Sequence, residues 1–206
     1  MKTKAQFLLT IIWSISASAT LTILAAIPLF HSLVNIFQLP ELTYLSEKTI
    51  SYNFDKLMRY LLNPVISKLD MPDFTSSQAG LKHFADVKQL FLLAILLTVI
   101  LLAPTFLFIK KKRYIQFYPG IKICLVIPVF IGVMALFGGF DSIFISFHRI
   151  FFRDATWLFD PATDPIINIL PENYFMLCFM IFGVIYMVFW SYLLLKTKRS
   201  FSNEKN

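Results

Sequence analysis

Four long apolar runs limit this chain to folds that cross a lipid bilayer. They cover residues of about 7–30, 90–109, 121–137 and 174–195. A helix of about 20 apolar residues is long enough to cross the hydrocarbon core, and it satisfies its own backbone hydrogen bonds there. The sequence therefore predicts an all-α membrane protein with four transmembrane helices.

The composition agrees with a membrane protein and disfavours a soluble domain. Of the 206 residues, 57% are hydrophobic and only 15% are charged, whereas about a quarter of the residues of a soluble domain are charged. Cys124 and Cys178 each lie inside an apolar run without a neighbouring histidine or cysteine. We interpret both as small buried hydrophobic residues, because nothing in their spacing indicates a disulfide framework or a metal site.

The distribution of charge predicts which segments face the cytoplasm. Three segments carry an excess of lysine and arginine over acidic residues: the one before the first run, the one between the second and third, and the one after the fourth. Together their excess is ten. The segment 31–89 is neutral and the segment 140–172 has a net charge of −3. By the positive-inside rule, both termini are cytoplasmic and these two segments are extracytoplasmic. The net charge of +7 is thus a topology signal, and no nucleic-acid partner is expected.

We expect a single membrane domain over residues 1–206, with a small, partly helical extracytoplasmic cap built from 31–89 and 140–172. The first run is too long for a typical signal peptide, so we expect an uncleaved anchor. Apolar residues from Phe54 to Leu69 follow the spacing of an amphipathic helix. We expect Asn53 to cap this helix, Pro64 to kink or split it, and its apolar face to lie on the bilayer or the mouth of the bundle.

Two of the three histidines occupy unusual positions in the cap. We expect a helix to begin at Ser76 or Ser77 and to continue into the second apolar run, with His83 and Asp86 on one face. His83 then lies roughly 10 Å above Leu90, at the depth of the lipid headgroups.

His148 follows Gly138 and Gly139, which interrupt the third helix, and it takes the place of an aromatic residue in a stripe of phenylalanines. An ionisable side chain at the lipid boundary is a candidate functional residue. The alternative is an interfacial histidine with satisfied hydrogen bonds, which is how we interpret His31.

Several neighbouring side chains are candidates for orienting a substrate or a histidine. Asp86 would orient His83 as a general base, and Arg153 would hold a phosphate, a carboxylate or a developing oxyanion. Trp157 is more typical of an interfacial aromatic belt, and Asp160 of a turn cap. The full set of candidates is Asp86, Phe147, Phe151, Arg153, Trp157 and Asp160.

The chain lacks the familiar motifs of several enzyme classes. There is no glycine-rich phosphate loop, no zinc-binding motif and no nucleophile elbow. Two histidines and Asp86 have the chemistry of metal ligands, but their surroundings are aromatic rather than rich in supporting carboxylates, so no metal is predicted.

Three stretches resemble the lipoprotein intramolecular transacylases, called Lit, of Gram-positive bacteria. They are residues 52–58, residues 80–88 and the long run 147–175. The four-span layout matches as well, so the resemblance covers essentially the whole chain, without a departure at the motif positions. It implies a multi-pass protein of the bacterial cell membrane, with two catalytic histidines where an extracytoplasmic cap meets the membrane, at His83 and His148.

The resemblance also implies a reaction. The substrate would be a diacylglyceryl lipoprotein, whose sn-2 acyl chain moves onto the α-amino group of its N-terminal cysteine to give the lyso-form. Conversion of an ester to an amide is downhill, so no cofactor is expected. Imidazoles with a pKa near 6.5 suit both the base and the acid role, and which histidine takes which is left open. A non-catalytic accessory or sensor protein and a metal-dependent membrane hydrolase are the alternatives.

Overall fold

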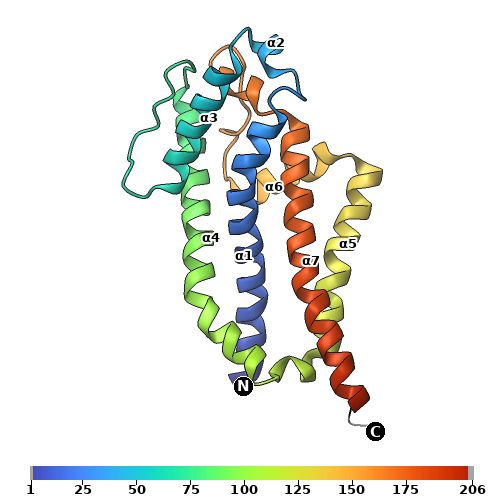
Figure 1. The fold of residues 1–206 in the computed structure, drawn as a ribbon. Coiled ribbons are helices and arrows are strands. Elements are labelled where there is room, and N and C mark those ends of the chain that lie inside the picture. The colour runs from blue at the N-terminus through green and yellow to red at the C-terminus, as the bar shows by residue number, and fades with distance from the viewer. Residues whose placement is uncertain (1, 204–206) are drawn as a thin grey trace. The chain divides into compact units, whose positions relative to one another are not determined.

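The computed structural model describes residues 2–203, and these contain helices and connecting loops but no strand. Figure 1 follows the chain from the N-terminus to the C-terminus. The elements in chain order are α1 (Lys2–Leu33), α2 (Leu39–Thr43), α3 (Glu47–Leu62), α4 (Gln78–Lys110), η1 (Arg113–Phe117), α5 (Tyr118–Gly138), α6 (Phe140–Phe151), η2 (Pro165–Ile169) and α7 (Glu172–Asn203).

Four helical stretches are long and apolar enough to cross a membrane. They are Thr3–Leu33, Gln78–Lys110, Arg113–Gly138 and Glu172–Asn203. Each contains one of the four apolar runs of the sequence and extends beyond it. The prediction of an all-α membrane protein with four spanning helices is therefore confirmed.

The chain divides into two compact units, and the first consists of residues 1–21, 94–139 and 180–206. Its described residues pack around aromatic rings. Trp190 is fully buried, and its indole Nε1 donates a hydrogen bond to Ser14 Oγ over 3.1 Å. Phe7 stacks on Phe117 with ring centroids 4.4 Å apart. These contacts fix helices whose outer faces are apolar.

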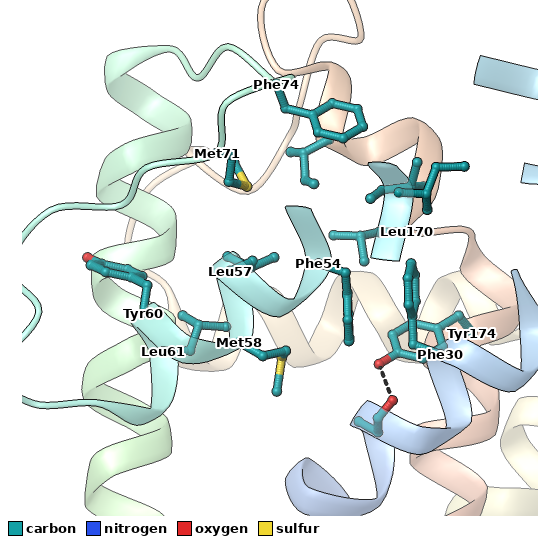
Figure 2. Close-up of a cluster of buried hydrophobic side chains, with 14 of the residues drawn as sticks. Phe30, Phe54, Leu57, Met58, Tyr60, Leu61, Met71, Phe74, Leu170 and Tyr174 are labelled. Carbon is teal, nitrogen blue, oxygen red and sulfur yellow. Dashed lines mark hydrogen bonds between the residues drawn. The ribbon is translucent and has the colours of Figure 1, made fainter. Parts of the chain in front are cut away.

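The second unit, residues 22–93 and 140–179, has its core around the amphipathic helix α3. Figure 2 shows this core, in which Phe54 of α3 stacks on Phe30 of α1 with ring centroids 3.7 Å apart. The hydroxyl of Tyr174 donates to the carbonyl oxygen of Ala26 over 3.0 Å. The apolar face of α3 is thus buried against the protein itself, and the alternative of a face lying on the bilayer is wrong.

The expected cap of this helix is also wrong. α3 begins six residues before Asn53, and its N-cap is Ser46, whose Oγ accepts the backbone N–H of Thr49 over 3.1 Å. Asn53 is instead fully buried in mid-helix and holds Asp73 of the following loop through two hydrogen bonds. The helix ends at Leu62, so the expected break near Pro64 is confirmed.

The two other expected helix boundaries are confirmed. α4 begins at Gln78, and Ser77 caps it by accepting the backbone N–H of Gly80 at its Oγ. Gly139 separates α5 from α6 with a φ of 78°, a value that glycine adopts without strain. α6 begins at the next residue, Phe140, and it carries His148.

Candidate active site

The N-terminal turns of α4 hold His83 in place. Ser77 caps the helix, and its own backbone N–H donates to Asp164 Oδ1 over 2.8 Å. Asp164 is buried, with only 3% of its surface exposed. Gly80 leaves room for this carboxylate, because a Cβ there would lie 2.1 Å from Asp164 Oδ1. The start of the helix is thus anchored from two sides, six residues before the imidazole.

His148 lies in the last turn of α6, and its ring is oriented by the main chain. Its Nδ1 is 2.7 Å from the carbonyl oxygen of Phe144, one turn earlier. A carbonyl oxygen only accepts hydrogen bonds, so Nδ1 carries the proton of the neutral ring. The other ring nitrogen, Nε2, then bears the free lone pair and is the atom able to accept a proton.

The two imidazoles are close neighbours although 65 positions separate them in the chain. Their ring centroids are 5.8 Å apart and their planes are inclined by 33°. The fold therefore brings the two histidines to one place in the second unit.

Aromatic side chains enclose both rings. Phe152 contacts both, with its centroid 4.6 Å from that of His83 and 5.5 Å from that of His148. Phe159 lies 5.5 Å from His83, and Trp157 lies 4.8 Å from His148. As a result His83 and His148 expose only 7% and 9% of their surfaces. Little water remains to stabilise a charge on either ring.

This enclosure sets the protonation state of His148. Burial lowers its pKa below the usual value of 6.5, and the hydrogen bond to the Phe144 carbonyl offsets part of that effect. The imidazole is therefore neutral at neutral pH and ready to accept a proton. A neutral imidazole can act as a general base.

His83 has an unmet hydrogen bond. Its Nδ1 is buried and has no hydrogen-bond partner among the described residues. A buried polar atom without a partner costs about 1–3 kcal/mol. A polar group of a bound substrate would relieve this cost. The pair thus combines a base of defined tautomer with a second imidazole that lacks a partner.

The family model that matches this sequence is that of the lipoprotein intramolecular transacylase Lit, over residues 5–175. This chain belongs to the Lit family. The family is one of acyltransferases, so the expectations of a membrane protein and of an enzyme of this class are confirmed. A search of curated proteins gives no significant match.

Solved structures of a Lit protein share this fold. The membrane-integral lipoprotein intramolecular transacylase Lit from Bacillus cereus superposes with a TM-score of 0.77 at 24% identity, covering 98% of each chain. Two variants of that protein, in which one histidine is replaced by arginine or by alanine, superpose with TM-scores of 0.67 and 0.70 at 24% and 21% identity. The first covers 96% of this chain and 95% of the variant, the second 98% and 96%.

Among the candidates for substrate contact, the aromatic ones lie closest to the histidines. Trp157 and Phe147 contact His148, with ring centroids 4.8 and 5.6 Å away. Phe151 packs on Phe147 instead and exposes 51% of its surface. Trp157 is thus part of the aromatic enclosure in this Lit structure.

The polar candidates lie elsewhere. Within residues 2–203, no hydrogen bond joins Asp86 to His83, so the expected orienting contact is not formed. Arg153 is exposed at the surface. Asp160 accepts the backbone N–H of Ala162 over 2.9 Å, which is the turn-capping alternative. The described residues also contain no group of three or more metal-binding side chains.

Sequence reasoning missed the ion pair beside the site. Lys82 of α4 pairs with Asp154, which also accepts a hydrogen bond from the Thr156 hydroxyl over 2.7 Å. The bonds from Lys82 and Thr156 lower the pKa of Asp154 to about 2. The pair connects α4 to the loop that carries Trp157. The only signals of this ion pair in the sequence are the position of Lys82 next to His83 and that of Asp154 after the stripe of phenylalanines.

Proposed function

We propose that this chain moves the sn-2 acyl chain of a diacylglyceryl lipoprotein onto the α-amino group of the lipoprotein's N-terminal cysteine, with His83 and His148 as the catalytic pair. The observation that carries the proposal is the 5.8 Å separation of the two enclosed imidazoles in a member of the Lit family. The name of the B. cereus protein supports a lipoprotein as the substrate.

In this mechanism His148 is the base. Its Nε2 accepts a proton from the cysteine amine as the nitrogen attacks the sn-2 ester carbonyl. The C–N bond forms, the C–O bond of the ester breaks, and the glyceryl oxygen leaves with its electron pair. His83 donates a proton to that oxygen and receives in exchange the proton that His148 has taken up, so both imidazoles end neutral. The net transfer is one proton from nitrogen to oxygen, so no oxidant, nucleotide or water is consumed.

The tautomer of His148 supports this division of roles. The bond between Nδ1 and the Phe144 carbonyl leaves Nε2 as the proton acceptor of the neutral ring. The sequence leaves the two roles open and offers Asp86 as the residue that would orient His83 as the base, and no hydrogen bond joins these two side chains in the described residues. Amine and ester belong to one molecule, so the protein's main contribution is to hold them in contact.

Mass spectrometry of a reporter lipoprotein tests the proposal. Cells produce the wild type, His83→Gln, His148→Gln or His31→Gln at matched levels, and the N-terminal peptide of the reporter is analysed. His31 is the control, because it is exposed and paired with Asp55. We expect the lyso-form with the wild type and His31→Gln only. Full conversion by either of the other variants would remove that histidine from the mechanism.

An assay with the purified protein distinguishes a transacylase from an accessory protein and from a metal-dependent hydrolase. It is incubated in detergent with a synthetic diacylglyceryl lipopeptide that has a free cysteine amine. We expect N-acylation without any added component and without a response to a chelator. An inactive protein would favour an accessory role, and release of free fatty acid that a chelator abolishes would favour a metal-dependent hydrolase.

The sidedness of the site is part of the same proposal. The charge distribution supports cytoplasmic termini, with a single membrane domain whose residues 31–89 and 140–172 face outward. A membrane-impermeant thiol reagent added to whole cells should label Val65→Cys and leave Lys111→Cys unlabelled, with the native cysteines replaced by alanine. The reverse pattern would invert the topology.

A further inference from the structure

A small cavity lined by cations lies on the second unit, away from the two histidines. It has a volume of about 110 Å³ and is lined by Lys56, Arg59, Tyr60, Ile66, Lys68 and Asp70. Lys56 and Arg59 are three residues apart on α3, so they lie on one face of the helix. Lys68 and Asp70 come from the loop that follows α3, which runs beside α4 (Figure 1).

The charge of this cavity is unbalanced. Three cationic side chains line it together with a single carboxylate, Asp70. Within residues 2–203, none of the three cations forms an ion pair; the two ion pairs found there are Lys82–Asp154 and His31–Asp55. Three like charges that line one cavity with a single counter-charge repel one another. An anion in the cavity would remove this repulsion.

A buried lysine fixes the depth of the cavity along α4. The Nζ of Lys88 donates to the carbonyl oxygen of Ile66 and lies 4.4 Å from the centroid of the Tyr60 ring. Both partners line the cavity. Lys88 is two residues before Leu90, or about 3 Å along the helix axis, and Leu90 begins the apolar run. The cavity is therefore at the depth where phospholipid phosphates lie.

The rim of the cavity is suited to contact with lipid. Val65 adjoins Ile66 in the same loop and exposes 86% of its surface. An exposed aliphatic side chain beside lysine and arginine is typical of a segment at the membrane interface, where the apolar group enters the lipid and the cations meet the headgroups.

We propose that this cavity binds the phosphate of an anionic glycerophospholipid, held by Lys56, Arg59 and Lys68. Arg59 presents the planar donor array that suits phosphate oxygens, and the lysines supply further charge. The acyl chains extend along Val65 toward the apolar part of α4. Such a lipid would fix the height of the second unit relative to the bilayer surface, independently of the transfer reaction.

Native mass spectrometry tests this proposal with the full-length protein in nonionic detergent. The protein is titrated with dioleoylphosphatidylglycerol, and the variant Arg59→Gln/Lys68→Gln is compared with the wild type. Loss of two charge-assisted contacts should weaken binding about tenfold or more. Lys48→Gln, an exposed lysine of α3 outside the cavity, is the matched control and should bind like the wild type.

Two further arms identify the ligand and control for folding. Arg59→Lys/Lys68→Arg keeps the charges and should restore binding. Dioleoylphosphatidylcholine should bind more weakly than phosphatidylglycerol, and inorganic phosphate at millimolar concentration should not displace the bound lipid. Equal retention of phosphatidylglycerol by the wild type and the charge-removing variant would overturn the proposal. Displacement by inorganic phosphate would overturn the assignment to a lipid.

Discussion

Asp164 reaches across the fold to Ser77, accepting its backbone N–H over 2.8 Å at the point where the helix bearing His83 begins. The hydroxyl of Thr163 donates to the second oxygen of the same carboxylate over 3.0 Å. A segment 87 positions away in the chain thus determines where α4 starts. We therefore expect a change at this contact to shift the first turns of the helix that bears His83.

Gly80→Ala should therefore impair both stability and transfer. The new Cβ would lie 2.1 Å from Asp164 Oδ1, so the carboxylate or the helix start must shift. Crowding of this kind costs about 1–3 kcal/mol. Thermal unfolding in detergent measures the loss. Gly183→Ala is the control, because a Cβ there meets nothing within 4 Å. Equal melting temperatures for both variants would contradict the proposed role of Gly80.

The pH dependence of transfer should reflect the lowered pKa of His148. Because burial keeps that pKa below 6.5, most of the base is neutral at pH 6.5, and kcat, measured with saturating substrate, should fall to half its maximum only at lower pH. A pH–rate profile with a lipopeptide substrate measures the acidic limb. A midpoint at or above 6.5 would contradict this expectation, or would assign the limb to another group.

The same group should make the fold less stable in acid. Unfolded His148 takes up a proton near pH 6.5, and the folded residue does so only at a lower pH. Its contribution to stability is therefore complete above 6.5 and is lost as the pH falls through the folded pKa. Unfolding midpoints of the wild type and His148→Gln, measured from pH 7.5 to pH 5, should converge toward acidic pH. A constant difference would exclude this linkage.

Phe152→Ala should raise the pKa of His148. Phe152 is the ring that contacts both imidazoles, and its removal admits water that stabilises the protonated form. The acidic limb of the pH–rate profile should then move toward 6.5. Phe152→Leu keeps an apolar side chain and should preserve most of the lowered pKa. If both variants have the wild-type profile, the enclosure does not control protonation.

Asn53→Ala should destabilise the second unit. The Asn53 amide is fully buried, accepts the backbone N–H of Asp73 over 3.2 Å and donates to its carboxylate over 2.7 Å. Its removal deletes both hydrogen bonds, one of them to a charged carboxylate, at a cost of about 1–3 kcal/mol. Denaturant unfolding should detect this loss, whereas Ser51→Ala, a partly exposed position on the same helix, should unfold like the wild type.

The length of the four apolar runs was enough to predict the spanning helices, because it depends on the local sequence alone. The break at Gly139 and the start of α4 at Ser77 were predicted for the same reason. The cap at Asn53 failed because the apolar series was read from Phe54, whereas polar residues from Glu47 onward already belong to the helix. Asn53 is buried although it is polar, because Asp73 satisfies its side-chain amide. Local spacing does not reveal this partner, which lies 20 positions away in the loop after α3.

The histidines were predicted as candidates from their positions, but their neighbours were predicted less well. Helical spacing placed Asp86 near His83, although a shared helix face does not ensure a hydrogen bond. The partners that the structure reveals, Asp154 beside Lys82 and Phe159 beside His83, lie more than 70 positions away. Such contacts depend on how the loop after α6 packs on α4, which no local pattern specifies.

The hydrogen bond that orients His148 has a consequence for substitutions at position 144. Its acceptor is the main-chain carbonyl of residue 144, and every amino acid supplies that atom. A substitution at this position therefore keeps the acceptor of the His148 hydrogen bond. It changes only the ring that packs on the imidazole, whose centroid lies 4.1 Å from that of His148.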